Sequence, residues 1–254
     1  TRTLDTWFDS SITILYLLNK YSLDSNKVAK IRMQGYDIIR TWLYYSLLRF
    51  YQLKNDLAFD YAIINGMGLD EHGRKMSKSL GNLIMPEEVE NVGIDCARLW
   101  FSMECSIGSD YRISLEKIKS MKAFLTKLLN IANFISQFKL NGKPKELKAS
   151  DKWILSEIYN LKREVLKHYK KFEINLATQK IYNFVWEIYA SHYIELVKKR
   201  AYENDISAIY TLYETFKEIL ILLAPIIPAT CDYIYRELFN KSILFEKFGK
   251  VKKI

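Results

Sequence analysis

The sequence predicts an α/β region followed by an all-α region, because two residue types change in frequency along the 254 residues. Seven of the nine glycines precede residue 113, which indicates more turns and loops in that part. Residues 1–112 hold 13 Lys and Arg against 14 Asp and Glu, whereas residues 113–254 hold 25 against 15. The net charge is therefore −1 before residue 113 and +10 after it. We expect a loop-rich α/β part and a second part of long, basic helices.

The composition limits the class of protein. With 49% hydrophobic residues, the chain can bury one or two hydrophobic cores. No apolar run reaches the roughly 20 residues that cross a bilayer, and we expect neither a membrane span nor a signal peptide. Cys96, Cys105 and Cys231 lie far apart and form no Cys-x-x-Cys pair, so the sequence supports no zinc site and no disulfide. These features predict a cytoplasmic protein.

Two short strands are expected in the α/β part. The first ends at Gly35 and leads into a helix that starts near Asp37 and extends to about residue 51. The second covers residues 61–65, whose β-branched and aromatic side chains are typical of a buried parallel strand. In α/β sheets, ligands bind where strands end and helices begin. On local grounds, Asp37 is predicted to cap its helix.

A basic loop follows the second strand, and we call residues 75–79 the signature loop. The run Lys75-Met76-Ser77-Lys78-Ser79 places two ammonium groups and two hydroxyl groups within five residues, with glycines on either side. Lysines and hydroxyl groups of this kind can close over a polyphosphate. An isolated Lys-Ser-Lys segment is usually only a solvated turn. Here the preceding strand and the helix start at Pro86 favour phosphate binding instead.

From residue 114 onwards, the apolar residues recur at helical spacing. Two short helices are expected before that point, within residues 83–103, with Asp95 near the start of the second. Five helices of an up-down bundle follow, with Asp151 as the cap of the second and a basic tail of four lysines at residues 247–253. The bundle helices are expected over residues 114–138, 151–169, 175–200, 207–223 and 229–239. The basic charge suits a nucleic-acid surface, and ordinary lysine-rich helix faces explain it equally well.

The signature loop, with the strand before it and Leu80-Gly81-Asn82 after it, resembles that of the class I aminoacyl-tRNA synthetases. The resemblance implies that the α/β part is the second half of a Rossmann-like nucleotide-binding fold and that the helical part binds the anticodon. It also implies that Lys75 and Lys78 are catalytic and stabilise the departing pyrophosphate of ATP, aided by Mg²⁺. The ATP-binding residues that it implies are Gly35 and Asp37 at the ribose, Asn65 and Gly66 at the adenine, and Lys75, Met76, Ser77, Lys78 and Ser79 in the loop.

Two further segments resemble the valyl-tRNA synthetases of the archaeal type. They are Asp5-Thr6-Trp7-Phe8-Asp9-Ser10-Ser11 and Asp37-Ile38-Ile39-Arg40-Thr41-Trp42. The resemblance implies that Trp7, Ile38 and Trp42 form the amino-acid pocket, and Ile38 and Trp42 are four residues apart and hence on one helix face. By themselves, such aromatic and aliphatic side chains are as compatible with a place in the hydrophobic core as with a pocket. The isoleucyl relatives typically carry Gln directly after this Asp.

The implied activity is the ATP-dependent activation of valine and its transfer to tRNA(Val). By the resemblance, residues 1–69 are the C-terminal half of the catalytic domain, residues 70–112 the signature loop and a connecting helical region, and residues 113–254 the anticodon-binding bundle. The sequence contains no His-x-Gly-His motif and no editing domain, so we expect a fragment that is inactive alone. The alternatives are a catalytically inactive tRNA-binding module and a fragment of an isoleucyl-tRNA synthetase. A P-loop protein is not supported, because no Gly-x-x-x-x-Gly-Lys-Ser/Thr run occurs.

Overall fold

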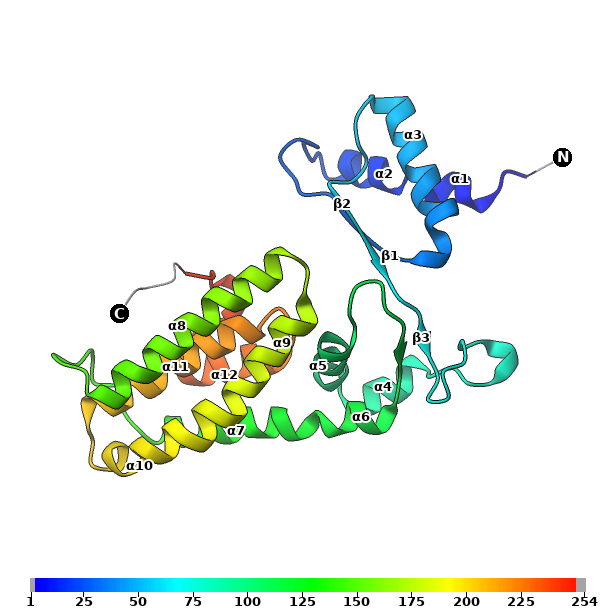
Figure 1. The fold of residues 1–254 in the computed structure, drawn as a ribbon. Helices are drawn as coiled ribbons and strands as arrows, with labels where there is room; N and C mark the ends of the chain where they lie inside the picture. The colour runs from blue at the N-terminus through cyan, green and yellow to red at the C-terminus, as the bar shows by residue number, and fades with distance from the viewer. Residues whose placement is uncertain (1–2, 250–254) are drawn as a thin grey trace. The chain divides into compact units, whose positions relative to one another are not determined.

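The structure, a computed structural model, describes residues 3–249 and divides into two compact units (Figure 1). The first unit extends to Met76 and also includes Cys105–Arg112, and the second comprises Ser77–Glu104 and the residues from Ile113 onwards. The division falls inside the signature loop. The boundaries expected after residues 69 and 112 rest on the family resemblance and stay predictions. Of the basic tail, residues 250–253 lie outside the described part of the chain.

The first unit combines short helices with two small parallel sheets. β1 and β2 pair in parallel from Ile31 with Tyr61 to Gly35 with Asn65, which confirms both predicted strands. β3 and β4 form the second parallel pair. Between β1 and α3, the chain passes through the 3-10 turn η1 and the π-helical turn η2, so the expected helix begins irregularly. The elements are α1 (Thr6–Ser10), α2 (Thr13–Lys20), β1 (Ile31–Gly35), η1 (Tyr36–Ile38), η2 (Ile39–Leu43), α3 (Tyr44–Lys54), β2 (Tyr61–Asn65), β3 (Gly68–Leu69) and β4 (Tyr111–Arg112).

The strands of the first unit leave much apolar surface exposed, so the expectation of a buried strand is wrong for most of β2. The side chains of Ile31, Met33 and Tyr61 are 45%, 60% and 56% exposed, and Ile63 alone is buried in β2. Along β1, the buried side chains are Arg32 and Gln34. A parallel sheet becomes buried on both faces only when other elements cover both. The described first unit covers one face of β1 and leaves the other open.

The second unit is a helical bundle in which α8 packs against α9 and α11, and α12 packs against α7 and α11 (Figure 1). All five predicted bundle helices are confirmed, although the first is split at Met121 and the third contains the π-helical segment η4. The two short helices before them are also present. The elements are η3 (Lys78–Leu80), α4 (Pro86–Val92), α5 (Ile94–Glu104), α6 (Leu115–Ser120), α7 (Lys122–Ser136), α8 (Ala149–Lys170), α9 (Ile174–Asn183), η4 (Phe184–Ile194), α10 (Glu195–Tyr202), α11 (Ile206–Leu223), α12 (Pro228–Phe239) and η5 (Ile243–Phe245).

Helix α11 lies at the centre of the bundle core, since 13 of its 18 residues are buried. Two buried tyrosines of the bundle have hydrogen-bonded hydroxyl groups. Tyr189 donates to the carbonyl of Leu212 at 2.7 Å, and Tyr213 donates to that of Phe138 at 2.9 Å. Satisfying these groups avoids the cost of an unpaired buried donor. Within residues 3–249, no helix is both long and apolar enough to span a bilayer.

Asp151 is not a helix cap, and this prediction is wrong. Helix α8 begins at Ala149, and Asp151 lies in its first turn with a completely buried side chain. Its carboxylate accepts hydrogen bonds from Arg200 Nη2 at 2.7 Å, from Tyr193 Oη at 2.9 Å and from Ser207 Oγ. We call these four residues the Asp151 cluster. The cluster ties the start of α8 to η4, to α10 and to the start of α11.

Candidate active site

The ends of β1 and β2 bring four of the predicted ATP-binding residues together. Gly35 pairs with Asn65 at the last position of the parallel register, and each strand ends there. Asp37 follows two residues after Gly35, and Gly66 follows Asn65 directly. Adjacent carboxyl ends of parallel strands are where α/β folds bind nucleotides. The structure thus places the two halves of this predicted site side by side within the first unit.

Asp37 lies directly against Gly35. A Cβ atom added to Gly35 would lie 2.8 Å from Oδ1 of Asp37, so a larger residue would displace the carboxylate. Asp37 sits inside η1, whose N-cap is Gly35, and no side chain caps this turn. The local prediction of a helix cap is therefore wrong. The Asp37 side chain is exposed, which leaves its carboxylate accessible to a ligand's hydroxyl groups.

Gly66 is required by a close backbone approach. A Cβ atom there would lie 1.9 Å from the carbonyl oxygen of Ser109 and 2.6 Å from the amide nitrogen of Asp110. The Asp110 carboxylate also accepts a hydrogen bond from the amide of Met67 at 2.7 Å. Residues 105–112 thus pack against the end of β2, although they are about 40 residues away in the sequence. Sequence reasoning missed this segment, because no local pattern announces a contact across more than 40 residues.

The turn before the signature loop is built around Asp70. This buried carboxylate accepts hydrogen bonds from the amides of His72 at 3.0 Å and Arg74 at 2.8 Å, and from Arg74 Nε at 2.8 Å. An isolated antiparallel bridge joins Leu69 to Lys75. Lys75 is exposed. Asp70 was not predicted as a site residue, and its effect is to shape the chain immediately before the first lysine of the loop.

Within the second unit, Ser77 orders the rest of the signature loop. Its hydroxyl oxygen accepts a hydrogen bond from the amide of Leu80 at 3.3 Å and lies 3.2 Å from the hydroxyl of Ser79. Its amide donates to Oδ1 of Asn82 at 2.9 Å. Gly81 ends η3 in the left-handed region, with φ +62°. These contacts order the backbone after Ser77, and Lys78 remains exposed.

The predicted amino-acid pocket residues come from three elements of the first unit, and Ile38 is the last residue of η1. α1 carries Trp7 and packs against η2, which contains Trp42. Trp42 Nε1 donates a hydrogen bond to the carbonyl oxygen of Ser10 at 3.0 Å. Trp7, Ile38 and Trp42 are all partly buried, so each can offer some surface to a ligand and some to the protein. Their assignment to a valine pocket stays a prediction.

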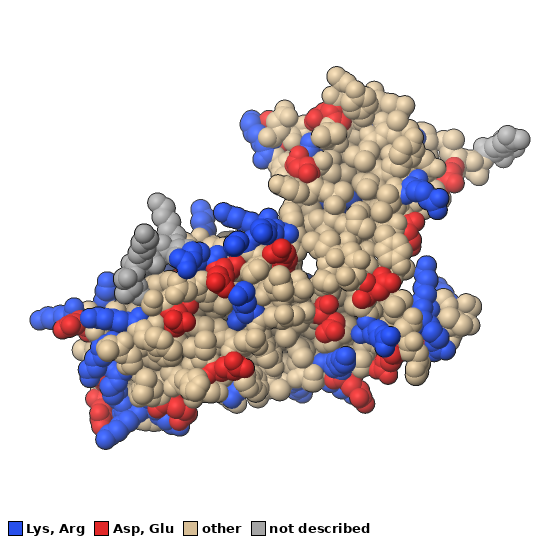
Figure 2. Space-filling view, in the orientation of Figure 1, with Lys and Arg blue, Asp and Glu red and all other residues tan. Residues whose placement is uncertain are grey.

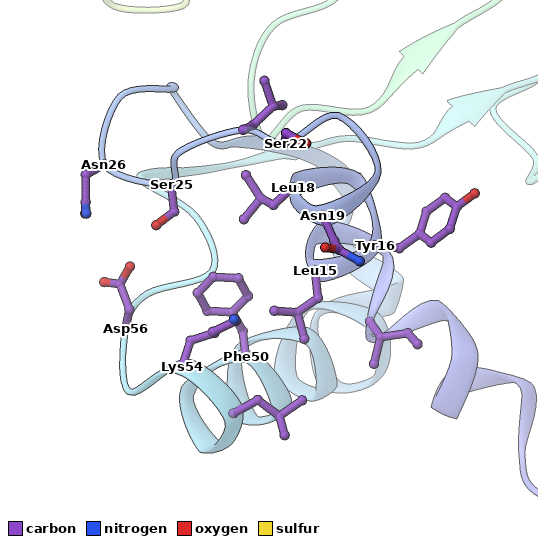
Figure 3. A pocket seen from close by; sticks show the side chains of 13 residues that line it. Leu15, Tyr16, Leu18, Asn19, Ser22, Ser25, Asn26, Phe50, Lys54 and Asp56 are labelled. Carbon is purple, nitrogen blue, oxygen red and sulfur yellow. The ribbon is translucent and has the colours of Figure 1, made fainter.

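A pocket of about 1000 Å³ lies elsewhere in the first unit (Figure 3). Leu15 and Leu18 of α2 and Phe50 of α3 form its apolar part, and Asn26 and Asp56 lie at its edge. It contains none of the residues predicted to bind ATP or the amino acid. This pocket therefore does not coincide with the site that the sequence predicts.

The segment after the signature loop is anchored to the helical bundle. Arg98 of α5 donates to the carbonyl oxygens of Ile226 at 2.7 Å and Pro225 at 2.9 Å. The buried Asp95 carboxylate accepts from the amide and the hydroxyl of Thr230, at 2.7 and 2.6 Å, at the start of α12. Asp95 was expected only as a charge near a helix start. Its additional contact with α12 joins residues 135 positions apart and has no sequence signal.

The charges of the helical unit are mixed on its visible face, where Lys and Arg alternate with Asp and Glu (Figure 2). Exposed ion pairs of this unit include Lys180 with Glu164 at 2.6 Å and Lys198 with Glu195 at 3.4 Å. The visible face of the first unit is largely uncharged (Figure 2). The basic excess of residues 113–254 belongs to the helical unit, where basic and acidic side chains are interspersed on the face shown.

Comparison with known protein families matches both parts of the chain. Residues 1–114 match the family of class I tRNA synthetases (I, L, M and V), and residues 151–253 match the anticodon-binding domain of tRNA ligase. Among solved structures, the chain resembles the Agrobacterium radiobacter K84 agnB2 LeuRS in its ternary complex with tRNA and LeuAMS, with a TM-score of 0.81 at 20% identity, over 98% of this chain and 34% of that one. It also resembles the Mycobacterium tuberculosis methionyl-tRNA synthetase in complex with methionyl-adenylate, with a TM-score of 0.71 at 21% identity, over 90% of this chain and 48% of that one. These two likenesses support the predicted fold.

Curated relatives are more similar in sequence. The valine–tRNA ligase of Nanoarchaeum equitans is 49% identical over 99% of this chain and 35% of its own length. Those of Pyrobaculum aerophilum and Saccharolobus solfataricus are 43% and 39% identical, over 96% and 98% of this chain and 32% and 31% of their own lengths. The chain therefore spans about a third of the length of these relatives. It belongs to the class I aminoacyl-tRNA synthetase family, and within that family its sequence groups with the valine–tRNA ligases.

Proposed function

We propose that this chain carries the second half of the ATP and valine site of a valine–tRNA ligase, together with its anticodon-binding bundle. The observation that supports it most is the pairing of Gly35 with Asn65, which sets the exposed Asp37 beside the second strand end. Lys75 and Lys78 then belong to a loop whose backbone is ordered by neighbouring side chains. Asp37 accepts hydrogen bonds from the ribose hydroxyls, and Asn65 and Gly66 lie against the adenine.

The reaction assigned to the whole enzyme begins with valine activation. A carboxylate oxygen of valine attacks the α-phosphorus of ATP, the α–β phosphoanhydride bond breaks, and pyrophosphate leaves with the bonding electrons. Such a transfer needs positioning and charge stabilisation more than covalent catalysis. Lys78, and with it Lys75, stabilises the negative charge that grows on the departing pyrophosphate. The valyl group is then transferred from the adenylate to tRNA(Val).

Mg²⁺ enters this proposal with the nucleotide. Within residues 3–249, no three His, Cys, Asp or Glu side chains converge as a metal site would require. Mg²⁺ usually keeps several water ligands and binds through substrate phosphates with one or two carboxylates. It would neutralise part of the triphosphate charge when bound. The protein's own contribution in this loop is the pair of lysines.

The helical unit is assigned to tRNA. Its net charge supports electrostatic attraction to the phosphate backbone, and the match of residues 151–253 to anticodon-binding domains supports anticodon recognition. Splayed-out anticodon bases can be read one by one. We expect binding that weakens steeply with salt but keeps a preference for tRNA(Val) at moderate ionic strength.

Two measurements on the 254-residue chain test the proposal, with a chimaeric ligase as reference. In the chimaeric ligase, this chain replaces the matching third of the Nanoarchaeum equitans relative. We expect valine-dependent pyrophosphate exchange by the chimaeric ligase and none by the chain alone, because the first half of the nucleotide-binding fold supplies much of the site.

Filter binding of tRNA(Val) and of a mismatched tRNA to the chain tests the bundle. We expect preferential binding of tRNA(Val) at moderate salt.

Pyrophosphate exchange by the chain alone would contradict the proposal that the chain holds only half of the active site. Equal, equally salt-sensitive binding of both tRNAs would remove the anticodon assignment, and an inactive chimaera beside an active relative would contradict the catalytic one.

A further inference from the structure

Two cationic side chains at the start of β1 are buried, but they differ in what they contact. Lys30 is 6% exposed, and its ammonium group donates to the carbonyl of Leu57 at 2.9 Å and lies 3.6 Å from the Asp56 carboxylate. Arg32 is 8% exposed, and among the described residues its one hydrogen bond is a long contact of 3.4 Å from Nε to Gln34. Its buried Nη2 has no hydrogen-bond partner there. Lys30 is therefore paired, whereas Arg32 is a buried cation without a carboxylate.

Such a cation is costly for the fold. Burial without a neighbouring negative charge lowers the pKa of Arg32 to about 10. A desolvated charge without a partner destabilises a folded chain, and an apolar residue of similar size would often be neutral or stabilising in its place. Stability therefore does not account for Arg32.

The contact that Arg32 does make is with Trp42. The central guanidinium carbon lies 2.9 Å from the centre of the Trp42 ring, so the cation covers one face of the indole. The indole edge is held as well, because Nε1 donates to the carbonyl of Ser10 at 3.0 Å. A face contact and an edge contact together restrict both the tilt and the rotation of the ring.

We propose that Arg32 is a positioning residue for amino-acid selection, which holds the plane of Trp42 so that this ring rejects side chains larger than valine. The inference rests on the proposed function, in which Trp42 is a wall of the amino-acid pocket. In this proposal Arg32 acts through its contact with Trp42 and does not itself bind the substrate. A planar guanidinium stacks on an indole in a way that the flexible ammonium group of lysine does not reproduce. Arg32→Lys should therefore behave like Arg32→Met.

The first test examines the stack in the 254-residue chain itself. The chain is labelled with 5-fluorotryptophan, and Trp42→Phe assigns the ¹⁹F resonance of position 42. We expect Arg32→Met and Arg32→Lys to shift and broaden this resonance, whereas Lys30→Met leaves it in place. Arg32→Met should keep or raise the melting temperature, and Lys30→Met should lower it, because that variant loses a satisfied contact. An unmoved Trp42 resonance in both Arg32 variants would overturn the proposed restraint.

The second test uses pyrophosphate exchange by the chimaeric ligase with valine and with isoleucine. One methylene in a hydrophobic pocket is worth about 10- to 200-fold in discrimination, a range that derives in part from enzymes of this family. We expect Arg32→Met to lower the Val/Ile ratio of kcat/KM by roughly tenfold, and Trp42→Leu by at least as much, while Lys30→Met changes it less than about twofold.

The outcomes separate the two proposals. A ratio that falls in Trp42→Leu but not in Arg32→Met would reject the role of Arg32 and retain the pocket. A ratio unchanged in both variants would reject the pocket assignment of Trp42, and the role of Arg32 with it. A fall in Arg32→Met with valine kcat within about twofold of the unmodified enzyme would support positioning, because a general loss of structure would lower both.

Discussion

The two units of this chain differ most in how completely they bury their apolar side chains. The continuous hydrophobic core of the described residues lies wholly in the second unit, where α11 alone buries 13 side chains. In the described first unit, the buried apolar residues are Phe50, Ala58 and Ile63. At the same time, residues such as Met33, Leu53 and Leu57 are at least 60% exposed there.

The difference follows from how helices and parallel strands find their partners. Amphipathic helices joined by short connections pack against neighbours from the same stretch of sequence. Parallel strands need crossover connections and cover on both faces, and these can come from distant sequence. The helical unit therefore has what it needs for stability within residues 77–249. The first unit positions its site residues but leaves one face of its sheet open.

The largest expected consequence is a difference in local stability between the units. Amides of β1 and β2 should exchange with solvent at least roughly a thousandfold faster than those of α11, because local opening free energies range from near zero to the global value. Hydrogen exchange followed by mass spectrometry measures both in one sample. Equal protection of β2 and α11 would show that the exposed apolar surface of the first unit does not limit its stability.

The second prediction concerns the Asp151 cluster. Disrupting this cluster should lower the stability of the helical unit and so reduce its difference in stability from the first unit. Arg200→Met leaves the Asp151 carboxylate buried with hydroxyl partners alone, and breaking a buried pair in this way costs about 3–5 kcal/mol. Urea unfolding followed by the helical circular dichroism signal reports the change. Glu195→Gln is the control, since its pair with Lys198 on α10 is exposed and should contribute less than about 1 kcal/mol. A loss below that value for Arg200→Met would mean that the cluster does not hold α8 to α10.

The third prediction sharpens the comparison at the signature loop, where one unit ends and the other begins. In the chimaeric ligase, Lys78→Ala should lower kcat for valine-dependent pyrophosphate exchange about a hundredfold, or roughly 3 kcal/mol, because the cation meets charge that develops in the transition state. KM for valine should change little. Lys27→Ala, which removes an exposed lysine paired with Asp24, is the control. A normal kcat with a raised KM for valine would assign Lys78 to ground-state binding instead.

The smallest expected effect is on the acid stability of the helical unit. Burial raises the pKa of Asp151, but the hydrogen bonds from Arg200, Ser207 and Tyr193 outweigh it, so the pKa is lowered overall. A carboxylate with a lowered folded pKa stabilises the fold above its unfolded pKa of about 3.9, and this contribution is lost as the pH falls below that value.

Urea midpoints measured between pH 3 and pH 7 should therefore fall at the acidic end of that range. Asp205, whose pKa is lowered despite partial burial because Lys148 donates to it, should add to the same decline. In Asp151→Asn the decline should be shallower. An identical slope for the variant and the unmodified chain would assign the acid sensitivity to other carboxylates.

Local pattern was sufficient for much of this protein. The bundle helices follow from apolar spacing, and the strands ending at Gly35 and Asn65 follow from β-branched and aromatic runs between breaking residues. The signature loop at residues 75–79 and the segment from Asp37 to Trp42 indicated the family, and the curated relatives confirmed it. These features depend on neighbours within a few residues, which is why one sequence reveals them.

Only the tertiary structure decided which polar groups are buried and what they meet. The sequence alone is compatible with Asp151 and Arg32 at the protein surface. In the structure, Asp151 forms an ion pair with Arg200, 49 residues away, and Arg32 stacks on Trp42. The family resemblance implied that Gly66 lies at the adenine. The structure shows that a Cβ atom at Gly66 would also collide with the backbone of Ser109. Burial and partner choice depend on which distant segments converge, and the free energy of a charged or crowded group depends on that convergence rather than on its neighbours in the chain.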